Sequence, residues 1–325
     1  MIRRGPFLAG DLVQLTDPKG RLHTVVLEPG GRFHTHKGAL LHDDLIGANE
    51  GSVVQTDLGV GYLALRPLMS DFVLSMPRGA AIIYPKDASE ILFRADIRPG
   101  HTVVEAGVGS GALSLWLLQA LGPEGSLVSI ERREEFADIA RANVETFYHG
   151  APPCPWDVRL GDLNDVLPTM APEPVDRVIL DMLTPWECLD ASLDALVSGG
   201  VLLVYVATVT QLSRMMEAMR ESKRLTVPQA TESIVRNWHV EGLAVRPDHR
   251  GVGHTGFLTW ARKLSAGTTL PERVGRKVKP EYAAEDVEAW TPGAVGARVE
   301  TEKKVKELAK ESRKRASKAS AEDAQ

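Results

Sequence analysis

Short apolar stretches alternate with turn residues over the first seventy positions of the chain. Residues 12–15, 23–27 and 52–56 are rich in Leu, Val and Thr, and segments such as Asp17-Pro18-Lys19-Gly20 separate them. Pro, Gly and Asp set the backbone angles of tight turns, so the pattern predicts short antiparallel strands. We therefore expect a small all-β domain over residues 1–70.

From about Phe72 the pattern changes to apolar strand-like segments that alternate with amphipathic segments of helix length. This alternation predicts a parallel sheet covered by helices, and we assign it to a second domain at residues 71–270. The predicted strands are 101–105, 127–131, 157–160, 177–181 and 201–207. The predicted helices are 110–121, 134–147, 185–197 and 209–222.

The alternation of strands and helices ends in the last hundred residues of the chain. Two strand-like segments, 230–239 and 255–262, are separated only by a Gly- and His-rich stretch without a helix, so we expect them to pair antiparallel. Residues 271–325 are rich in Lys, Arg, Glu, Ala and Ser and carry no apolar stripe. We expect a charged, disordered tail that improves solubility, with a weak RNA contact as the alternative.

Composition narrows the function classes. Lys and Arg number 38 against 43 Asp and Glu, a net charge of −5, so any nucleic-acid partner has to be met by a local basic patch. The two cysteines, Cys154 and Cys188, lack metal-ligand spacing, and we expect neither a disulfide framework nor a metal site. Since no apolar run is long enough for a bilayer, we expect a cytoplasmic protein without a membrane partner.

A glycine loop is the strongest chemical signal. Gly107-Val108-Gly109-Ser110-Gly111 follows a predicted strand and opens a predicted helix, where backbone N–H groups can approach a ligand. Twenty residues after Gly111, at the end of the next predicted strand, lies Glu131. A carboxylate there can accept hydrogen bonds from the two hydroxyls of a ribose. The pair predicts an adenosine-containing cofactor.

The loop alone also fits the G-x-G-x-x-A pattern of NAD-binding proteins, so an NAD-dependent oxidoreductase is an alternative. Further acids end or follow predicted strands, at Glu105, Asp162 and Asp181. Four carboxylates, with Glu131, are expected to line the ligand crevice at one edge of the sheet. They disfavour a pyrophosphate and favour S-adenosylmethionine, which carries an ammonium and a sulfonium group and no phosphate.

Six segments of the chain resemble a known family. The chain is similar to the bacterial TrmI-type tRNA (adenine-N1)-methyltransferases over roughly residues 1–264. The segments that carry the resemblance are Arg4-Gly5-Pro6-Phe7 with Gly10-Asp11-Leu12-Val13-Gln14-Leu15, Tyr84-Pro85-Lys86-Asp87, the glycine loop from Glu105 to Leu113, Asp181-Met182-Leu183-Thr184-Pro185-Trp186-Glu187, Tyr205-Val206-Ala207-Thr208-Val209-Thr210-Gln211 and Gly253-His254-Thr255-Gly256-Phe257-Leu258.

The resemblance implies an α/β fold, a class I (Rossmann-like) methyltransferase sheet with an antiparallel C-terminal hairpin, preceded by the small β domain. It implies S-adenosylmethionine as cofactor, the T-loop adenosine 58 of tRNA as target, and a homotetramer built as a dimer of dimers. A catalytically inactive RNA-binding subunit is the second alternative.

The resemblance also assigns site residues. Asp181 would accept a hydrogen bond from the exocyclic amine of the target adenine, and Tyr84 and Tyr205 would hold the flipped-out base. The expected cofactor contacts are Gly107, Gly109, Ser110, Gly111, Ala112, Leu113, Glu131, Arg132, Phe136, Asp162 and Asp181. Of these, Ser110 to Leu113 would face the methionine part and ribose, Glu131 the ribose hydroxyls and Asp162 the adenine amino group. Phe136 departs from the family pattern, in which histidine is common, so a hydrogen bond from that position is lost.

Basic and polar side chains in the predicted β domain are candidates for tRNA phosphate contacts, with subunit contacts as the alternative. They are Arg3, Arg4, Lys19, Arg21, Arg32, His34, His36 and Lys37. Trp238, His239, Arg246 and Arg250 are further candidates for holding RNA.

Overall fold

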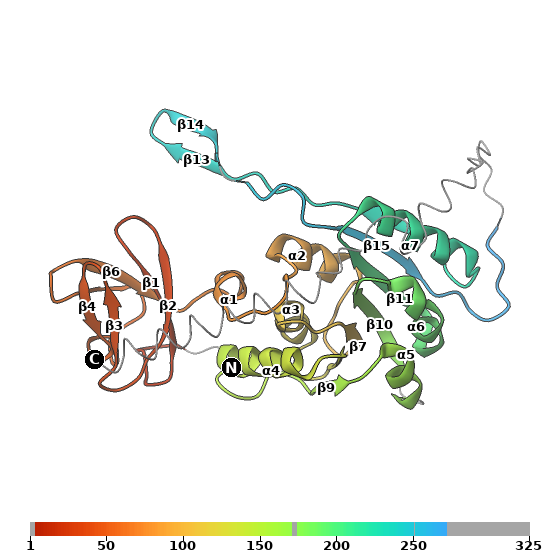
Figure 1. Cartoon of the computed structure of the whole chain (residues 1–325), viewed down its shortest axis with the longest axis horizontal. Coiled ribbons are helices and arrows are strands. Elements are labelled where there is room, and N and C mark those ends of the chain that lie inside the picture. Colours follow the sequence, from red (N-terminus) through yellow and green to blue (C-terminus); the bar gives the residue numbers. More distant parts are fainter. Residues whose placement is uncertain (1–3, 171–173, 250, 272–325) are drawn as a thin grey trace, which may run out of the picture. The chain divides into compact units, whose positions relative to one another are not determined.

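The computed structural model describes residues 4–170, 174–249 and 251–271 (Figure 1). The tail predicted at 271–325 lies outside these residues except for Pro271, as do Arg3 and Arg250. Among the described helices, none has the length and apolar character needed to cross a membrane.

Short antiparallel strands form the N-terminal region, as the turn pattern predicts. A four-stranded sheet has the order β2-β1-β6-β5, and a separate hairpin joins β3 to β4. The bounds are β1 Leu12–Thr16, β2 Leu22–Val26, β3 Arg32–Thr35, β4 Gly38–Leu41, β5 Ser52–Gln55 and β6 Gly61–Leu65, with a 3-10 turn η1 at His42–Asp44. Phe7, Leu15, Leu27, Leu40 and Tyr62 fill the core.

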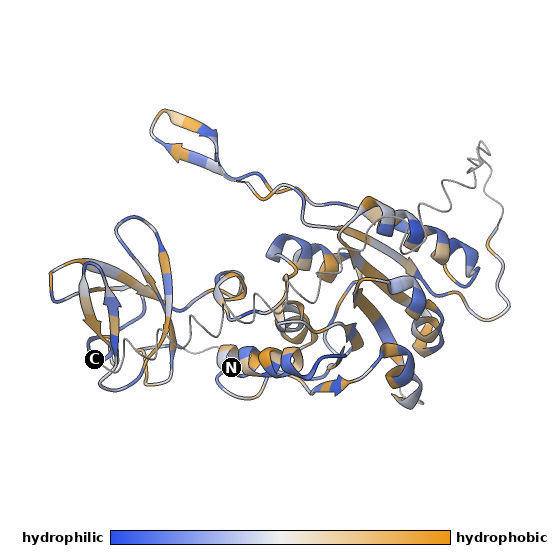
Figure 2. Ribbon diagram, viewed as in Figure 1, coloured by the Kyte–Doolittle hydropathy of each residue, from blue (hydrophilic) through white to orange (hydrophobic). Residues whose placement is uncertain are grey.

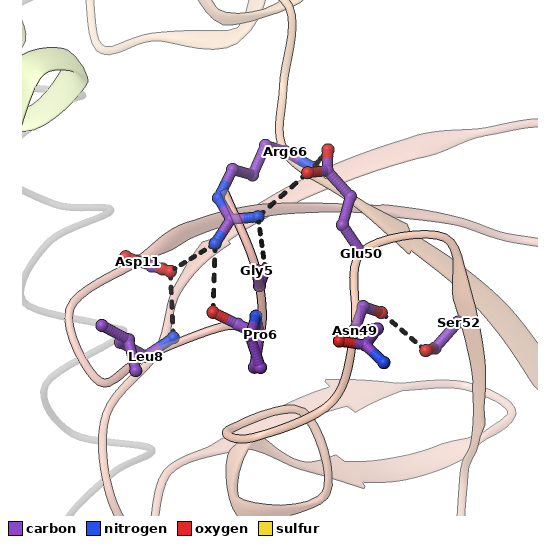
Figure 3. A network of polar contacts seen from close by, with 8 residues as sticks. All are labelled: Gly5, Pro6, Leu8, Asp11, Asn49, Glu50, Ser52 and Arg66. Carbon is purple, nitrogen blue, oxygen red and sulfur yellow. Dashed lines mark hydrogen bonds and ion pairs between the residues drawn. The ribbon is translucent and has the colours of Figure 1, made fainter. Parts of the chain in front are cut away.

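Arg66 contacts the Gly5-Pro6-Phe7 segment and Asp11, two parts of the family resemblance near the N-terminus (Figure 3). The Arg66 guanidinium donates to Asp11 Oδ2 at 3.1 Å, to Glu50 Oε2 at 2.9 Å and to the carbonyl oxygens of Gly5 and Pro6. It also lies 4.9 Å from the centre of the Phe7 ring. These contacts fix the first residues to the end of β6, so this part of the family pattern has a structural role.

A seven-stranded sheet forms the second part, in the order β12-β15-β11-β10-β7-β8-β9. Strands β7 to β11 are parallel, and β15 and β12 complete the edge in antiparallel pairing. The bounds are β7 Thr102–Ala106, β8 Ser126–Glu131, β9 Trp156–Leu160, β10 Val175–Asp181, β11 Leu196–Val206, β12 Gln229–Thr231 and β15 Phe257–Arg262. The strand order reverses between β7 and β10, and open sheets of this kind bind ligands at that point.

Helices cover both faces of this sheet, over two apolar clusters. Val103, Ile179 and Leu203 pack on the side of α1, α2 and α3, and Val178 and Leu202 pack on the side of α6 and α7. The central strands are apolar in Figure 2 because both of their faces are buried. The helices are α1 Met69–Ser75, α2 Pro85–Arg94, α3 Ala112–Leu121, α4 Glu134–Tyr148, α5 Leu163–Val166, α6 Leu189–Ala195 and α7 Val209–Glu221, with 3-10 turns η2 Leu167–Met170 and η3 Pro185–Cys188.

Two predicted elements are wrong in detail. The predicted strand 230–239 is divided: only β12 pairs with β15, whereas β13 Trp238–Glu241 pairs with β14 Ala244–Pro247 in a separate hairpin. Gly242, at φ +54°, makes the tight turn of this hairpin possible. The predicted helix 185–197 is a 3-10 turn followed by a helix that ends at Ala195, because β11 already begins at Leu196.

Candidate active site

A cavity of 610 Å³ opens at the carboxyl edge of the parallel strands. Residues at the ends of β7, β8, β9, β10 and β11 and in the loops that follow these strands line it, together with Ala80 and Ala81. Of the predicted site residues, it brings together Gly107, Gly109, Glu131, Arg132, Asp181 and Tyr205. The remaining predicted residues are not part of its lining.

The glycine loop needs its glycines for space. A Cβ on Gly107 would lie 3.2 Å from Glu131 Oε2, and one on Gly111 would lie 3.2 Å from Ala140 Cα. Gly111 also has φ +79° and precedes α3, so the helix begins at Ala112 rather than at Ser110. Ser110, Gly111, Ala112 and Leu113 are consequently buried at the junction of loop and helix.

Glu131 is held in place by backbone donors. Its Oε2 accepts from the Gly109 amide at 3.2 Å, and its Oε1 accepts from the amides of Arg132 and Arg133 at 3.1 and 3.2 Å. Its exposed fraction is 6%. A carboxylate has about four lone-pair sites, so Oε2 retains capacity for a further donor from the cavity side.

Asp181 ends β10 with a carboxylate that receives no hydrogen bond from the described residues, although its backbone oxygen accepts from the Gly107 amide at 3.1 Å. Burial, followed by the negative charge of Glu131, raises the pKa of Asp181 from 3.8 to about 7. An unpaired carboxylate in such a place is costly. The site is therefore suited to a ligand that brings a positive charge or a hydrogen-bond donor.

Two of the four carboxylates expected to line the crevice, Glu105 and Asp162, are not part of the cavity lining. Glu105 is 1% exposed, and its Oε2 accepts from the hydroxyls of Ser114 and Ser129 at 2.6 and 2.7 Å. It lies within the strand, where alternate side chains point away from each other, and not after its end. Burial raises the pKa of Glu105 to about 7.

Asp162 has a local role in the structure. Its Oδ1 accepts from the Asn164 amide at 3.0 Å and caps α5, and its Oδ2 pairs with Arg132. The Asn164 bond is the main cause that lowers the pKa of Asp162. The neighbouring Gly161 lines the cavity, whereas Asp162 does not.

The two predicted tyrosines lie near each other. Tyr205 lines the cavity, and its hydroxyl donates to the Thr255 carbonyl at 2.8 Å. Tyr84 is half-buried directly before α2. Burial raises the pKa of Tyr205, and smaller contributions come from the charges of Asp87 and Asp181 and from Tyr84.

Phe136 does not reach the cavity lining. Its ring centre lies 3.6 Å from the Arg133 guanidinium, and a Cβ on Gly79 would lie 3.2 Å from the ring. Phe136 therefore packs between the start of α4 and the segment that leads to Ala80.

Several lining residues had no assigned role in the sequence. They are Ala80, Ala81, Met182, Leu183, Thr184, Cys188, Ala207 and Gln211. Gln211 donates to the Leu183 carbonyl at 2.9 Å and forms a capping box with Thr208 at the start of α7. Most of them belong to the Asp181–Glu187 and Tyr205–Gln211 segments, so a signal for them was present.

The residues fit S-adenosylmethionine better than a dinucleotide. The two arginines in the cavity lining, Arg132 and Arg133, are already paired with Asp162 and Glu131. The carboxylate of Asp181 forms no ion pair among the described residues, which suits a ligand with positive charge and no phosphate. A Cβ at Gly109 would meet only open space, so the backbone there is accessible to a ligand. The NAD alternative is not favoured.

Comparison with known proteins agrees with this geometry. A family model described as TrmI-like N-terminal matches residues 5–54, and one described as tRNA methyltransferase complex GCD14 subunit matches residues 63–242. The tRNA (adenine(58)-N(1))-methyltransferase TrmI of Thermus thermophilus is 35% identical over 257 residues, which is 78% of this chain and 96% of that protein. The tRNA (adenine(57)-N(1)/adenine(58)-N(1))-methyltransferase TrmI of Methanocaldococcus jannaschii is 30% identical, over 76% of this chain and 93% of that protein.

Two solved structures share the fold. A SAM-dependent O-methyltransferase from Thermotoga maritima superposes with a TM-score of 0.74 at 29% identity, covering 80% of this chain and 95% of the other. The tRNA (m1A58) methyltransferase TrmI from Aquifex aeolicus superposes with a TM-score of 0.68 at 23% identity, covering 80% and 100%. The chain belongs to the tRNA methyltransferase family that the GCD14 subunit model describes.

Proposed function

We propose that this protein transfers a methyl group from S-adenosylmethionine to N1 of adenosine 58 in the T loop of tRNA. The observation that carries the proposal is the unpaired carboxylate of Asp181, which shares one cavity with Glu131 and with the ring of Tyr205. Family membership and the relatives that act on adenine 58 of tRNA support the choice of substrate.

The cofactor is held by the loops after β7 and β8. Glu131 accepts hydrogen bonds from the ribose hydroxyls, and the accessible backbone around Gly107 and Gly109 borders the same space. Ser110 to Leu113 face the methionine part and the ribose, and Asp162 faces the adenine amino group. Arg132 lines the cavity, and Phe136 packs against Arg133, which also lines it. When bound, S-adenosylmethionine supplies a methyl group on a positively charged sulfur.

Asp181 positions the target base. N1 of neutral adenine already carries a lone pair, so no strong base is required and orientation is the main catalytic task. The Asp181 carboxylate accepts a hydrogen bond from the exocyclic amine and thereby aims N1 into the cavity. The same negative charge stabilises the cationic 1-methyladenine as it forms.

Tyr84 and Tyr205 hold the extruded base. Taking a base out of its stack costs a few kcal/mol, and aromatic side chains offset this cost by stacking. The position of Tyr205 beside Asp181 supports this role, because the two residues are paired in the register of β10 and β11.

The protein acts as a cytoplasmic homotetramer, a dimer of dimers. Exposed apolar side chains on the β13–β14 hairpin support the oligomer, namely Trp238, Val240, Leu243 and Val245. Residues 1–70 form a domain for RNA binding and subunit contacts, and residues 271–325 form a solubilising tail. Arg32 and Lys37 lie on or beside the β3–β4 hairpin and belong to the RNA-binding set, whereas Arg21 is already paired with Asp17.

The test is a methylation assay on a defined substrate. The protein is incubated with labelled S-adenosylmethionine and an unmodified tRNA transcript, and the RNA is digested to identify the modified nucleoside by mass spectrometry. We expect 1-methyladenosine from the wild-type transcript and none from a transcript with uridine at position 58. Label in a different nucleoside, or equal label in both transcripts, would refute the proposal.

A further inference from the structure

Three residues of the family segments that have no assigned role, Lys86, Asp87 and Thr255, meet in the structure, although about 170 residues separate the two segments. Lys86 and Asp87 belong to the first turn of α2, and Thr255 precedes β15. The Thr255 hydroxyl donates to Asp87 Oδ2 at 2.6 Å and accepts a hydrogen bond from Lys86 Nζ. Lys86 Nζ also donates to Asp87 Oδ1 at 2.8 Å. We call Lys86, Asp87 and Thr255 the clasp.

The clasp is buried and its hydrogen bonds are satisfied. Asp87 is 1% exposed, and the side chain of Lys86 is 10% exposed. The third proton of the Lys86 ammonium goes to the Ser233 carbonyl at 2.7 Å. A buried ion pair of this kind contributes little net stability, since well-packed apolar residues are often as stable. It does fix one geometry, because each partner left alone would be an unpaired buried charge.

The clasp reaches the cavity through the loop that contains Thr255. The Thr255 carbonyl accepts the hydroxyl of Tyr205 at 2.8 Å, and Tyr205 lines the cavity. The next residue, Gly256, passes so close to the phenol that a Cβ there would lie 2.3 Å from Tyr205 Cζ. The position of this loop therefore determines where the ring of Tyr205 can lie.

The residue before Thr255, His254, is also held by polar contacts. His254 Nδ1 lies 2.7 Å from Glu232 Oε1, and its Nε2 lies 2.9 Å from the carbonyl oxygen of Ala207, another cavity-lining residue. His254 and Thr255 are therefore both held by hydrogen bonds to other elements, and Gly256 packs directly against the phenol of Tyr205.

We propose that Lys86, Asp87 and Thr255 are positioning residues that set the ring of Tyr205 at the wall of the base-binding cavity. The importance of this role for catalysis rests on the proposed function, in which Tyr205 holds the target adenine. The clasp touches neither substrate nor cofactor and acts through the Thr255 backbone. Its loss misplaces the base and lowers the rate of methyl transfer without removing any group that binds the cofactor.

The main experiment uses variants of matched shape. Thr255→Val removes only the hydroxyl, Thr255→Ser keeps it, and Asp87→Asn keeps the shape of the acid. Glu90→Gln is the control, because Glu90 lies on the same helix but pairs with Arg94, away from the cavity. Steady-state methylation of tRNA and calorimetric affinity for S-adenosylmethionine are measured for each, and thermal unfolding identifies variants that fail to fold.

We expect Thr255→Val and Asp87→Asn to lower kcat by about ten- to a hundredfold, the range expected when a reacting group shifts by roughly 1 Å. Cofactor affinity should stay within about twofold of wild type, a small change in binding free energy, since no group that binds the cofactor is altered. Thr255→Ser should restore most of the activity, and Glu90→Gln should behave as wild type. In the Tyr205→Phe background, Thr255→Val should lower kcat little further, because both changes disturb the same contact between Tyr205 and the Thr255 backbone.

A readout independent of activity separates this inference from the proposed function. The chain contains five tyrosines, so protein labelled with ¹³C at the tyrosine ζ carbon gives few signals, and Tyr205→Phe identifies that of Tyr205. We expect the signal to move in Thr255→Val and Asp87→Asn and to stay in Glu90→Gln. The proposed role of the clasp would be overturned by an unchanged Tyr205 signal in folded Thr255→Val. It would also be overturned if the losses of kcat caused by Thr255→Val and Tyr205→Phe were fully additive. If the Tyr205 signal moves in these variants but the wild-type protein methylates no tRNA, the positioning role of the clasp is upheld and the proposed function is refuted.

Discussion

Asp181 and Tyr205 are paired in the parallel register of β10 and β11, next to the point where each strand leaves the sheet. Both line the cavity, so a carboxylate and an aromatic ring are offered to a ligand side by side. Adenine needs both kinds of contact, because its edge carries an amine donor and its faces stack. The register of two neighbouring strands thus brings both groups to one wall of the cavity.

Replacing Asp181 tests the carboxylate directly. Asp181→Asn keeps the shape but removes the negative charge, and we expect kcat to fall by about 10²- to 10³-fold, the usual effect of removing one preorganised electrostatic interaction with a transition state. Single-turnover methylation of a tRNA transcript measures the loss. Asp157→Asn is the control, because Asp157 lies on the edge strand β9 and is paired with Arg159. Near-normal rates in Asp181→Asn would remove Asp181 from the mechanism.

The raised pKa of Asp181 predicts pH-dependent cofactor binding. At a pKa of about 7, the carboxyl is largely neutral at pH 6 and charged at pH 8. S-adenosylmethionine carries a sulfonium, whereas S-adenosylhomocysteine has a neutral sulfur and the same amino acid group. As the pH rises through about 7, Asp181 becomes negatively charged, so the affinity for S-adenosylmethionine should increase relative to the affinity for S-adenosylhomocysteine. Calorimetry at several pH values measures the ratio of the two affinities, and a ratio in Asp181→Asn that rises as steeply would contradict the assignment.

The same pKa has a consequence for stability. Since folding raises the pKa of Asp181 above its ordinary value of 3.8, the folded state binds the proton more tightly, and stability is lost as the pH rises from that value through about 7. Asp181→Asn should unfold at a higher temperature than wild type at pH 8, by roughly 2–4 °C for each kcal/mol of relief. The difference should vanish near pH 4. Calorimetric unfolding at both pH values is the measurement, and equal midpoints at pH 8 would show that the charge carries no cost.

The sequence was most informative at the ends of the parallel strands. Glu131 and Asp181 are last residues of apolar strands, and such positions converge at one edge of a parallel sheet, so their common cavity followed from the pattern. Glu105 is also an acid near a strand end, but Ala106 extends β7 by one more residue. That single residue places Glu105 inside the sheet, and strand ends are not defined this finely by apolar periodicity.

Contacts between distant segments were beyond the sequence pattern. The meeting of Asp87 with Thr255 depends on how α2 packs next to β15, which no local signal specifies. The β13–β14 hairpin was missed for a related reason: residues 230–239 were predicted as one strand, and their division depends on which partner strand each half pairs with. Segments of the family resemblance include Asp87 and Thr255, but their contact gives the structural reason for these two residues.

The exposed apolar side chains of the β13–β14 hairpin predict a site for the proposed subunit contacts. Leu243 at the hairpin turn is fully exposed, and Val240 is 69% exposed. Covering such side chains on association stabilises a complex, since each buried Å² of apolar surface contributes about 25 cal/mol. Val240→Glu with Leu243→Lys should reduce the molar mass in solution, as measured by light scattering. An unchanged tetramer would place the subunit contacts elsewhere, and a wild-type monomer would refute the oligomer altogether.

The β3–β4 region predicts a contribution to tRNA binding. Arg32 is exposed and Lys37 is half-buried, and neither forms an ion pair among the described residues. Reversing both charges should weaken tRNA binding and make the dependence of log affinity on log salt shallower, by somewhat less than about one unit for each phosphate that is no longer neutralised. Filter binding between low and moderate salt measures the slope. Arg141→Glu serves as the control, because Arg141 lies on α4 and pairs with Asp138. If the double variant keeps the wild-type slope, Arg32 and Lys37 do not contact phosphates. The alternative, a subunit contact, would then be tested by measuring the molar mass of the same variant in solution.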